Sequence, residues 1–101
     1  MFRITIAYNH PEDPEAFLAH YRSVHAPLTA TMPGISSFEW GVSETLDGSV
    51  PAHFVVGNLN FPSKDEALAA LGSPEGKAGG EDMANFAGAG FVMDMHEVEV
   101  A

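Results

Sequence analysis

One histidine near the end of a helical pattern is well placed for proton chemistry. His25 lies four residues after Tyr21, so in a helix the two side chains share roughly one face, and both are expected at the site. Because Pro27 follows closely, His25 should occupy the last turn, where the helix dipole favours the protonated form. Burial in a cavity would favour the neutral form. An imidazole between these two effects can accept or give a proton near neutral pH. The alternative is a histidine that only ties the helix to the sheet.

Aromatic residues in the strand patterns are candidates for lining a binding pocket. Tyr8, Phe38 and Trp40 are expected on strand faces that the helices cover. Tyr8 would add a hydroxyl group, and the Trp40 indole N–H would need a partner if buried. The alternative is ordinary core packing, which we favour for Phe38.

Two polar residues complete the candidate site. Asp82 either orients His25 or caps a short helix, and capping is the favoured interpretation. Asn58 is polar within an apolar strand pattern, so its amide should bond to the backbone or to a ligand.

The remaining histidines do not form a metal motif. His10 and His20 look like surface residues, while His53 and His96 lie in strand patterns. A metal site needs three or four convergent ligands, and no HxH, HxxxH or comparable local spacing occurs. The glycine clusters follow helical patterns rather than a strand, and there is no GxSxG. We therefore expect neither a metal nor another cofactor.

Two helical stretches must position these residues. Asp13 and Pro14 begin the first, which should end near His25 with one further turn after Pro27. The second begins at a capping box after Ser63 and should end at residue 71, with Gly72 in a left-handed conformation. Three glycines then argue against a continuous helix and leave a short helix at 81–86. They are Gly76, Gly79 and Gly80.

Alternating apolar residues predict four strands, at residues 2–8, 36–44, 53–61 and 91–100. The order βαββαβ indicates an α+β, ferredoxin-like antiparallel sheet with helices on one face. The other face is expected to carry Thr5 and Ala7 on the first strand, with Met93 and Met95 on the last. A partly apolar, uncovered sheet face predicts a homodimer surface.

Composition narrows the possible partners. The 101 residues make one domain, spanning 1–101. With 14 acidic and 4 basic residues the net charge is −10, which disfavours nucleic acid and anionic membranes. No apolar run approaches the roughly 20 residues of a membrane helix, and no signal peptide is evident. There is no cysteine, so disulfides and thiolate chemistry are excluded. A cytoplasmic location is the expectation.

Two segments resemble the signatures of the EthD family. The first combines Phe17, Tyr21, His25-Ala26-Pro27-Leu28 and Met32-Pro33-Gly34, and the second combines residues 73–76 with 82–86. This resemblance implies a ferredoxin-like monomer that pairs sheet to sheet into a dimeric α+β barrel. Similar proteins include isomerases, cyclases and cofactor-independent oxygenases acting on lactones, quinones or polyketide aromatics.

These observations predict a small cofactor-independent enzyme of isomerase, cyclase or oxygenase type. His25 would shuttle a proton on an apolar, oxygenated ring compound. A non-catalytic accessory or ligand-binding dimer is the alternative. Haem binding with His25 as axial ligand ranks last, because no basic pair is evident for the propionates.

Overall fold

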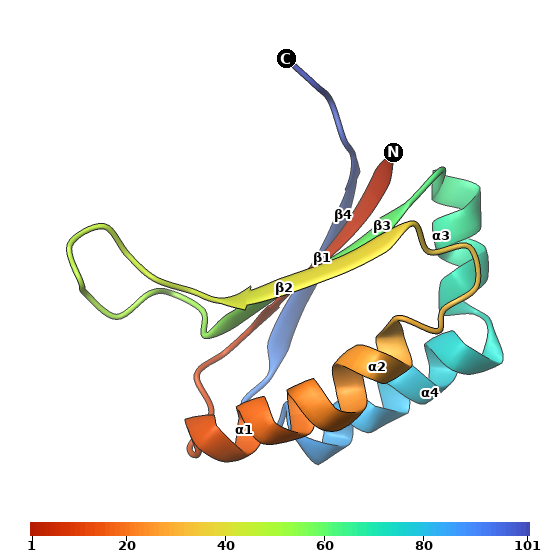
Figure 1. Cartoon of the computed structure of the whole chain (residues 1–101). Coiled ribbons are helices and arrows are strands. Elements are labelled where there is room, and N and C mark those ends of the chain that lie inside the picture. Colours follow the sequence, from red (N-terminus) through yellow and green to blue (C-terminus); the bar gives the residue numbers. More distant parts are fainter.

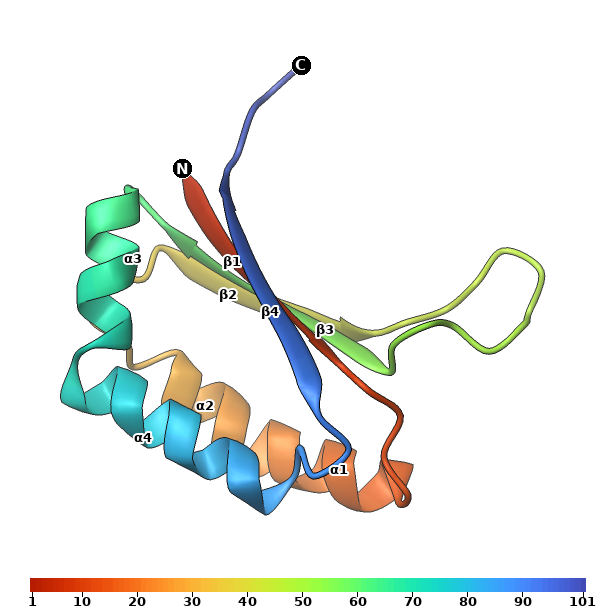
Figure 2. The same ribbon diagram turned by 180° about the vertical axis from the view of Figure 1, so that it is seen from behind.

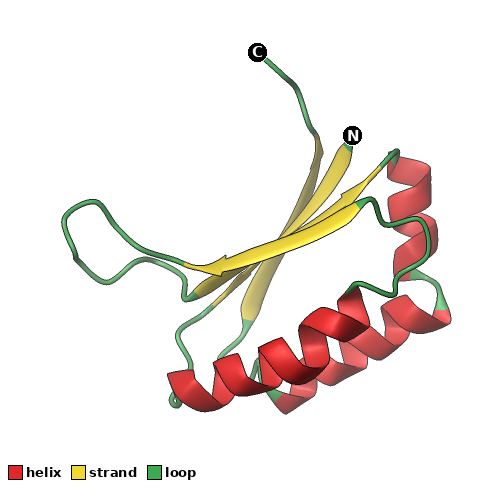
Figure 3. Cartoon of the chain, viewed as in Figure 1, coloured by secondary structure: helices red, strands yellow, loops and turns green.

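A computed structural model describes all 101 residues as one antiparallel sheet with every helix on one of its faces (Figures 1 and 3). The strands are β1 (Phe2–Tyr8), β2 (Ser37–Val42), β3 (Val55–Phe61) and β4 (Phe91–Glu97). They are arranged in the order β2-β3-β1-β4. The predicted α+β, ferredoxin-like architecture is confirmed. The predicted β1 has the observed ends, whereas the other three strands are shorter than their alternating patterns suggested.

The first helical segment contains the predicted further turn around Pro27, but the helix is not interrupted near His25. It comprises α1 (Pro14–His20), the π-helical turn η1 (Tyr21–His25) and α2 (Ala26–Thr29). Asp13 caps it as expected, since its side chain accepts from the N–H of Ala16 at 3.0 Å. The predicted end near His25 is wrong, because the backbone stays right-handed helical through His25 and Ala26 into α2, which contains Pro27. His25 is therefore not in the last turn of the segment.

The second helical segment contradicts the expectation from its glycines. It comprises α3 (Lys64–Leu71), α4 (Pro74–Asp82) and the 3₁₀ turn η2 (Met83–Asn85). Ser63 caps α3 as predicted. However, α4 runs through all three glycines, and Gly72 is right-handed at φ −83°. At Gly76 the reason is close packing: an added Cβ would collide with the carbonyl of Ala70.

The register of β4 corrects the predicted faces of the sheet. Met93 is paired with Ile6 and Met95 with Ile4, and antiparallel partners project to the same side. Since Ile4 and Ile6 are buried in the core beneath the helices, both methionines lie on the helix-covered face. The predicted face of β4 was wrong because it was based partly on Val98 and Val100, which lie beyond the end of the strand at Glu97.

The helix-free face is more polar than expected. Arg3 Nε donates to Asn60 Oδ1 at 2.7 Å, and the Asn60 amide donates to Ser37 Oγ at 2.9 Å and Glu39 Oε1 at 2.6 Å. The buried apolar residues gather on the opposite, helix-covered face. They are Phe2, Ile4, Ile6, Tyr8, Phe17, Tyr21, Met32, Val55, Leu59, Phe61, Ala67 and Ala70.

Candidate functional site

A buried histidine and aspartate form the centre of the candidate site. His25, on η1, is 3% exposed, and its Nδ1 lies 3.0 Å from Oδ2 of Asp82, the last residue of α4. A carboxylate can only accept, so Nδ1 carries the proton and Nε2 is left as a hydrogen-bond acceptor. Nε2 lies 3.5 Å from the hydroxyl group of Tyr8 on β1. Two helical segments and the sheet thus hold a single imidazole in one orientation.

Asp82 is held by more partners than the sequence indicated. His20 Nε2 lies 2.9 and 3.1 Å from its two carboxylate oxygens, and the Asn85 amide donates to Oδ1 at 2.9 Å. Asp82 makes no capping bond to the backbone of η2, so the favoured capping interpretation was wrong. His20, predicted to be a surface residue, is instead a partly buried partner of this carboxylate.

Burial and hydrogen bonding set the charge states of this group. Burial lowers the pKa of His25 below 6.5, and the hydrogen bond to Asp82 only partly opposes this effect. Burial pushes the pKa of Asp82 upward, but hydrogen bonds from Asn85, His20 and His25 outweigh it, so the net pKa is lowered. At neutral pH the site therefore holds a carboxylate beside a neutral imidazole.

Two buried phenol groups adjoin the imidazole. Burial raises the pKa of Tyr21 to about 12, and it raises the pKa of Tyr8 further still. The ring centroids of Tyr21 and His25 are 5.2 Å apart. Both tyrosines thus remain protonated hydrogen-bond donors across the physiological range.

A cavity of about 210 Å³ adjoins Tyr8, Tyr21 and His25 between the sheet and the helices. Apart from Thr29, its other lining residues are apolar or glycine: Ile6, Met32, Phe38, Leu59, Leu71, Gly76, Gly79, Gly80, Met83, Phe91 and Met93. No lysine or arginine is among them. A larger, open depression at the start of α1 contains Glu12 and Asp13 and does not reach His25.

The glycines of α4 help to create this cavity. Side chains at Gly79 and Gly80 would extend into open space, since no atom lies within 4 Å of an added Cβ. Phe91 and Met93, which line the cavity from the edge strand β4, are 42% and 49% exposed. Figure 2 shows β4 in front of the other strands, on the same side of the molecule as α4.

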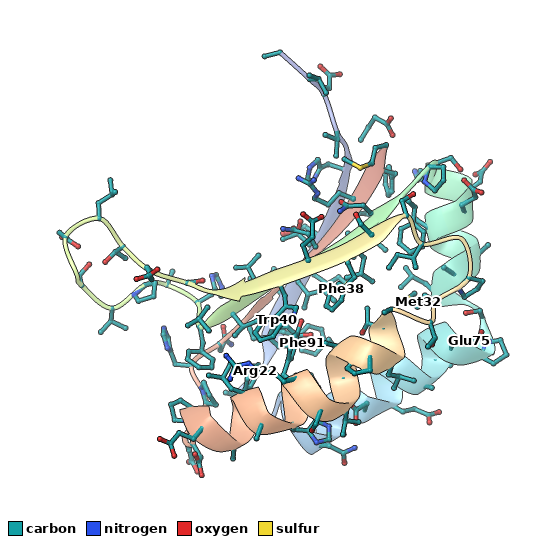
Figure 4. The ribbon with its side chains drawn as sticks, viewed as in Figure 1. Arg22, Met32, Phe38, Trp40, Glu75 and Phe91 are labelled. Atoms are coloured by element: carbon teal, nitrogen blue, oxygen red, sulfur yellow. The ribbon has the colours of Figure 1, made fainter.

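Not every predicted site residue meets the cavity. Figure 4 shows Phe38, Trp40 and Phe91 between the sheet and the helices. Phe38 lines the cavity, whereas Trp40 packs against Tyr21 with ring centroids 4.6 Å apart. Arg22 covers the Trp40 ring, its guanidinium carbon 5.6 Å from the centroid.

Asn58 lies on the opposite side of the sheet. Its amide oxygen accepts from the Thr5 hydroxyl at 2.9 Å, and Asn58 does not line the cavity near His25. The sequence predicted that this amide would bond to the backbone or to a ligand; its partner is instead the Thr5 side chain, on the helix-free face.

The chain contains no group of three His, Asp or Glu side chains that could hold a metal ion. No helix is both long and apolar enough to cross a membrane.

Comparisons with known proteins agree with this architecture. The EthD domain model matches residues 9–90. An "uncharacterized 11.0 kDa protein in thcB-thcC intergenic region" of Rhodococcus erythropolis is 46% identical over 93 residues, which are 92% of this chain and 90% of that protein. The crystal structure of an EthD family protein from Bacillus halodurans superposes with a TM-score of 0.91 at 27% identity, covering 98% and 99% of the two chains.

More distant structures share the fold. A dimeric ferredoxin-like protein of unknown function from Thermobifida fusca has a TM-score of 0.75 at 14% identity, over 96% of this chain and 90% of that one. Hydroxynitrile lyase from Passiflora edulis has a TM-score of 0.75 at 12% identity, over 99% and 95%. From the family model, which matches residues 9–90, we conclude that this chain belongs to the EthD family.

Proposed function

We propose that this chain is a cofactor-independent enzyme of isomerase, cyclase or oxygenase type that acts on a small, apolar, oxygenated ring compound. One observation carries the proposal: a buried, neutral imidazole, oriented by a carboxylate, lies at the wall of an apolar cavity. The fold accommodates catalysis, since a hydroxynitrile lyase shares it.

His25 would act as the proton shuttle. Its Nε2 lone pair would accept a proton from a carbon next to a carbonyl group, which leaves an enolate, and would return the proton to another position. The hydroxyl groups of Tyr8 and Tyr21 would donate hydrogen bonds to the oxygen on which negative charge develops. Such general acid–base catalysis contributes roughly 10²–10⁴-fold in rate.

The cavity restricts the size and charge of the ligand. A cavity of about 150 Å³ accepts benzene, so about 210 Å³ suits a single ring with a few substituents. Because no lysine or arginine lines the cavity, nothing there would neutralise a carboxylate or phosphate. The favoured ligand is therefore a neutral ketone, lactone or phenol.

We also propose a homodimer formed through the helix-free sheet face, in the cytoplasm. Val56, Ala7 and Val92 form an apolar row across neighbouring strands on that face. The structurally related protein from Thermobifida fusca is dimeric. Pairing two such faces would bury this row.

The test uses purified protein with a panel of neutral monocyclic ketones and lactones in D₂O. NMR follows the exchange of protons next to the carbonyl group, and calorimetry measures binding. We expect His25→Gln to lower the exchange rate roughly 10²–10⁴-fold. Gly79→Leu should abolish binding, because Gly79 lines the cavity and a leucine there would occupy part of its volume. Asn58→Ala, on the opposite face, is the matched control and should affect neither.

If His25→Gln binds a ring compound and exchanges its protons as fast as the unchanged protein, the catalytic proposal fails. The accessory, ligand-binding dimer would then be the better explanation. If no compound on the panel binds and Gly79→Leu changes nothing, both proposals for the cavity fail.

A further inference from the structure

We infer that His20 is a positioning residue, which holds Asp82 so that the carboxylate keeps His25 in the Nδ1–H tautomer. The catalytic meaning of this inference rests on the proposed function of His25, although its structural content does not. The sequence suggested only a surface histidine at this position.

The carboxylate of Asp82 joins two histidines. His20 Nε2 lies 2.9 Å from Oδ1 and 3.1 Å from Oδ2, while His25 Nδ1 lies 3.0 Å from Oδ2. Asn85 donates to Oδ1 at 2.9 Å. With donors on both oxygens the carboxylate is held against rotation, and His20 is the donor that reaches both.

The π-helical turn explains how two histidines five residues apart reach one carboxylate. In a regular α-helix, residues five apart point about 140° away from each other. Here the N–H of Ala26 donates to the carbonyl of Tyr21, five residues earlier, so residues five apart are turned closer to one face than in an α-helix. His20 and His25 therefore face Asp82 together. The π-helical turn could also serve to accommodate Pro27, but that role alone would not require a histidine at position 20.

Packing holds the His20 ring in place. It stacks on Phe86 with centroids 5.4 Å apart and an interplanar angle of 27°, and Phe86 also contacts the His25 ring at 4.6 Å. The side chain of His20 remains 26% exposed, whereas those of His25 and Asp82 are 4% and 8% exposed. His20 is thus on the outer side of the carboxylate, and its effect on the cavity passes through Asp82 to His25.

The chain allows a matched pair of variants that separates hydrogen bonding from packing. His20→Gln retains an N–H donor and loses the ring. His20→Phe retains a ring that can stack on Phe86 and loses the donor. The tautomer of His25 is read from its side-chain ¹⁵N chemical shifts in the full chain, at a pH where the imidazole is neutral, and no substrate is needed.

We expect the unchanged protein and His20→Gln to show mainly the Nδ1–H form of His25, with a small fraction of the Nε2–H form. His20→Phe should show a several-fold rise in the Nε2–H form and a matching loss of proton-exchange activity, which His20→Gln restores. An unchanged His25 tautomer in a folded His20→Phe protein overturns the inference. If His20→Phe does not fold, His20→Ala replaces it in the same comparison. Failure of the proposed function would appear separately, as unchanged exchange activity in His25→Gln.

Discussion

Two polar clusters, each built around a buried residue, lie on opposite faces of the same sheet, and only one of them adjoins the cavity between the sheet and the helices. The Asp82 cluster consists of Tyr8, His20, His25, Asp82 and Asn85, on the helix-covered face. The Asn60 cluster consists of Arg3, Ser37, Glu39 and Asn60, on the helix-free face. Both satisfy their buried polar atoms, as native proteins usually do.

The difference lies in what each cluster leaves free. Asn60 is 1% exposed, and its amide oxygen and nitrogen are all engaged by neighbouring strand residues. In the Asp82 cluster, His25 Nε2 has only a long 3.5 Å contact with the Tyr8 hydroxyl and adjoins the cavity. A polar cluster whose hydrogen bonds are all made therefore stabilises the fold. It becomes a candidate site when one of its groups can still accept a proton and faces a cavity.

The largest loss of stability is expected at Gly76, where the approach of α4 to the end of α3 leaves no room for a side chain. Gly76→Ala places a methyl group against the carbonyl of Ala70, so either α3 or α4 must shift. We expect a loss of about 3 kcal/mol in the free energy of unfolding, measured by urea denaturation. Gly80→Ala on the same helix meets no neighbour and serves as the control. A wild-type stability for Gly76→Ala would show that the two helices do not need this close approach.

A direct test of the comparison changes one residue in each cluster. Asp82→Asn and Asn60→Ala should each cost about 1–3 kcal/mol of stability, because each weakens buried hydrogen bonds. Only Asp82→Asn should lower the pKa of His25 further, since the Asp82 carboxylate raises that pKa. NMR titration of His25 measures this. The distinction between the clusters breaks down if Asn60→Ala shifts the pKa of His25 as much.

The Asp82 cluster also predicts a pH dependence of stability. The pKa of His25 is lowered in the folded protein, so below about 6.5 the unfolded chain binds a proton that the folded chain does not, and stability falls. The lowered pKa of Asp82 acts in the same direction, with stability lost as the pH falls below 3.8. Above pH 10.0 the raised pKa of Tyr21 favours the unfolded state, which loses its proton first.

Thermal unfolding across this pH range measures the effect. His25→Gln should flatten the decline just below pH 6.5, whereas Asn60→Ala should leave its shape unchanged. An unaltered decline in His25→Gln would assign the acid sensitivity to other groups.

The smallest effect is expected at Gly79. Gly79→Ala adds a methyl group in open space within α4, and it should stabilise the protein by about 0.5–1 kcal/mol through helix propensity. The same methyl group should weaken ring binding, because Gly79 lines the cavity. Calorimetry with and without ligand separates the two results. A destabilised Gly79→Ala would show that the cavity is already filled by neighbouring side chains.

Local patterns in the sequence determined much of the fold. Alternation predicted β1 with its observed ends, Asp13 and Ser63 predicted two helix starts, and the element order predicted the ferredoxin-like sheet. These features depend on neighbouring residues: side chains alternate along a strand, and a capping side chain binds a backbone N–H three residues later. The sequence also singled out His25, Tyr8 and Tyr21, which line one cavity.

Only the tertiary structure decided how distant residues meet. The face occupied by Met93 depends on the register of β4 against β1, and the alternating pattern alone does not determine which face that is. The meeting of His20 with Asp82 depends on a π-helical turn and on a helix 62 residues later in the chain. The hollow beside His25 depends on glycines whose missing side chains matter only once α4 packs under the sheet. Helix propensity scores these glycines only as unfavourable in a helix, because it takes no account of the space that a missing side chain leaves in the folded protein.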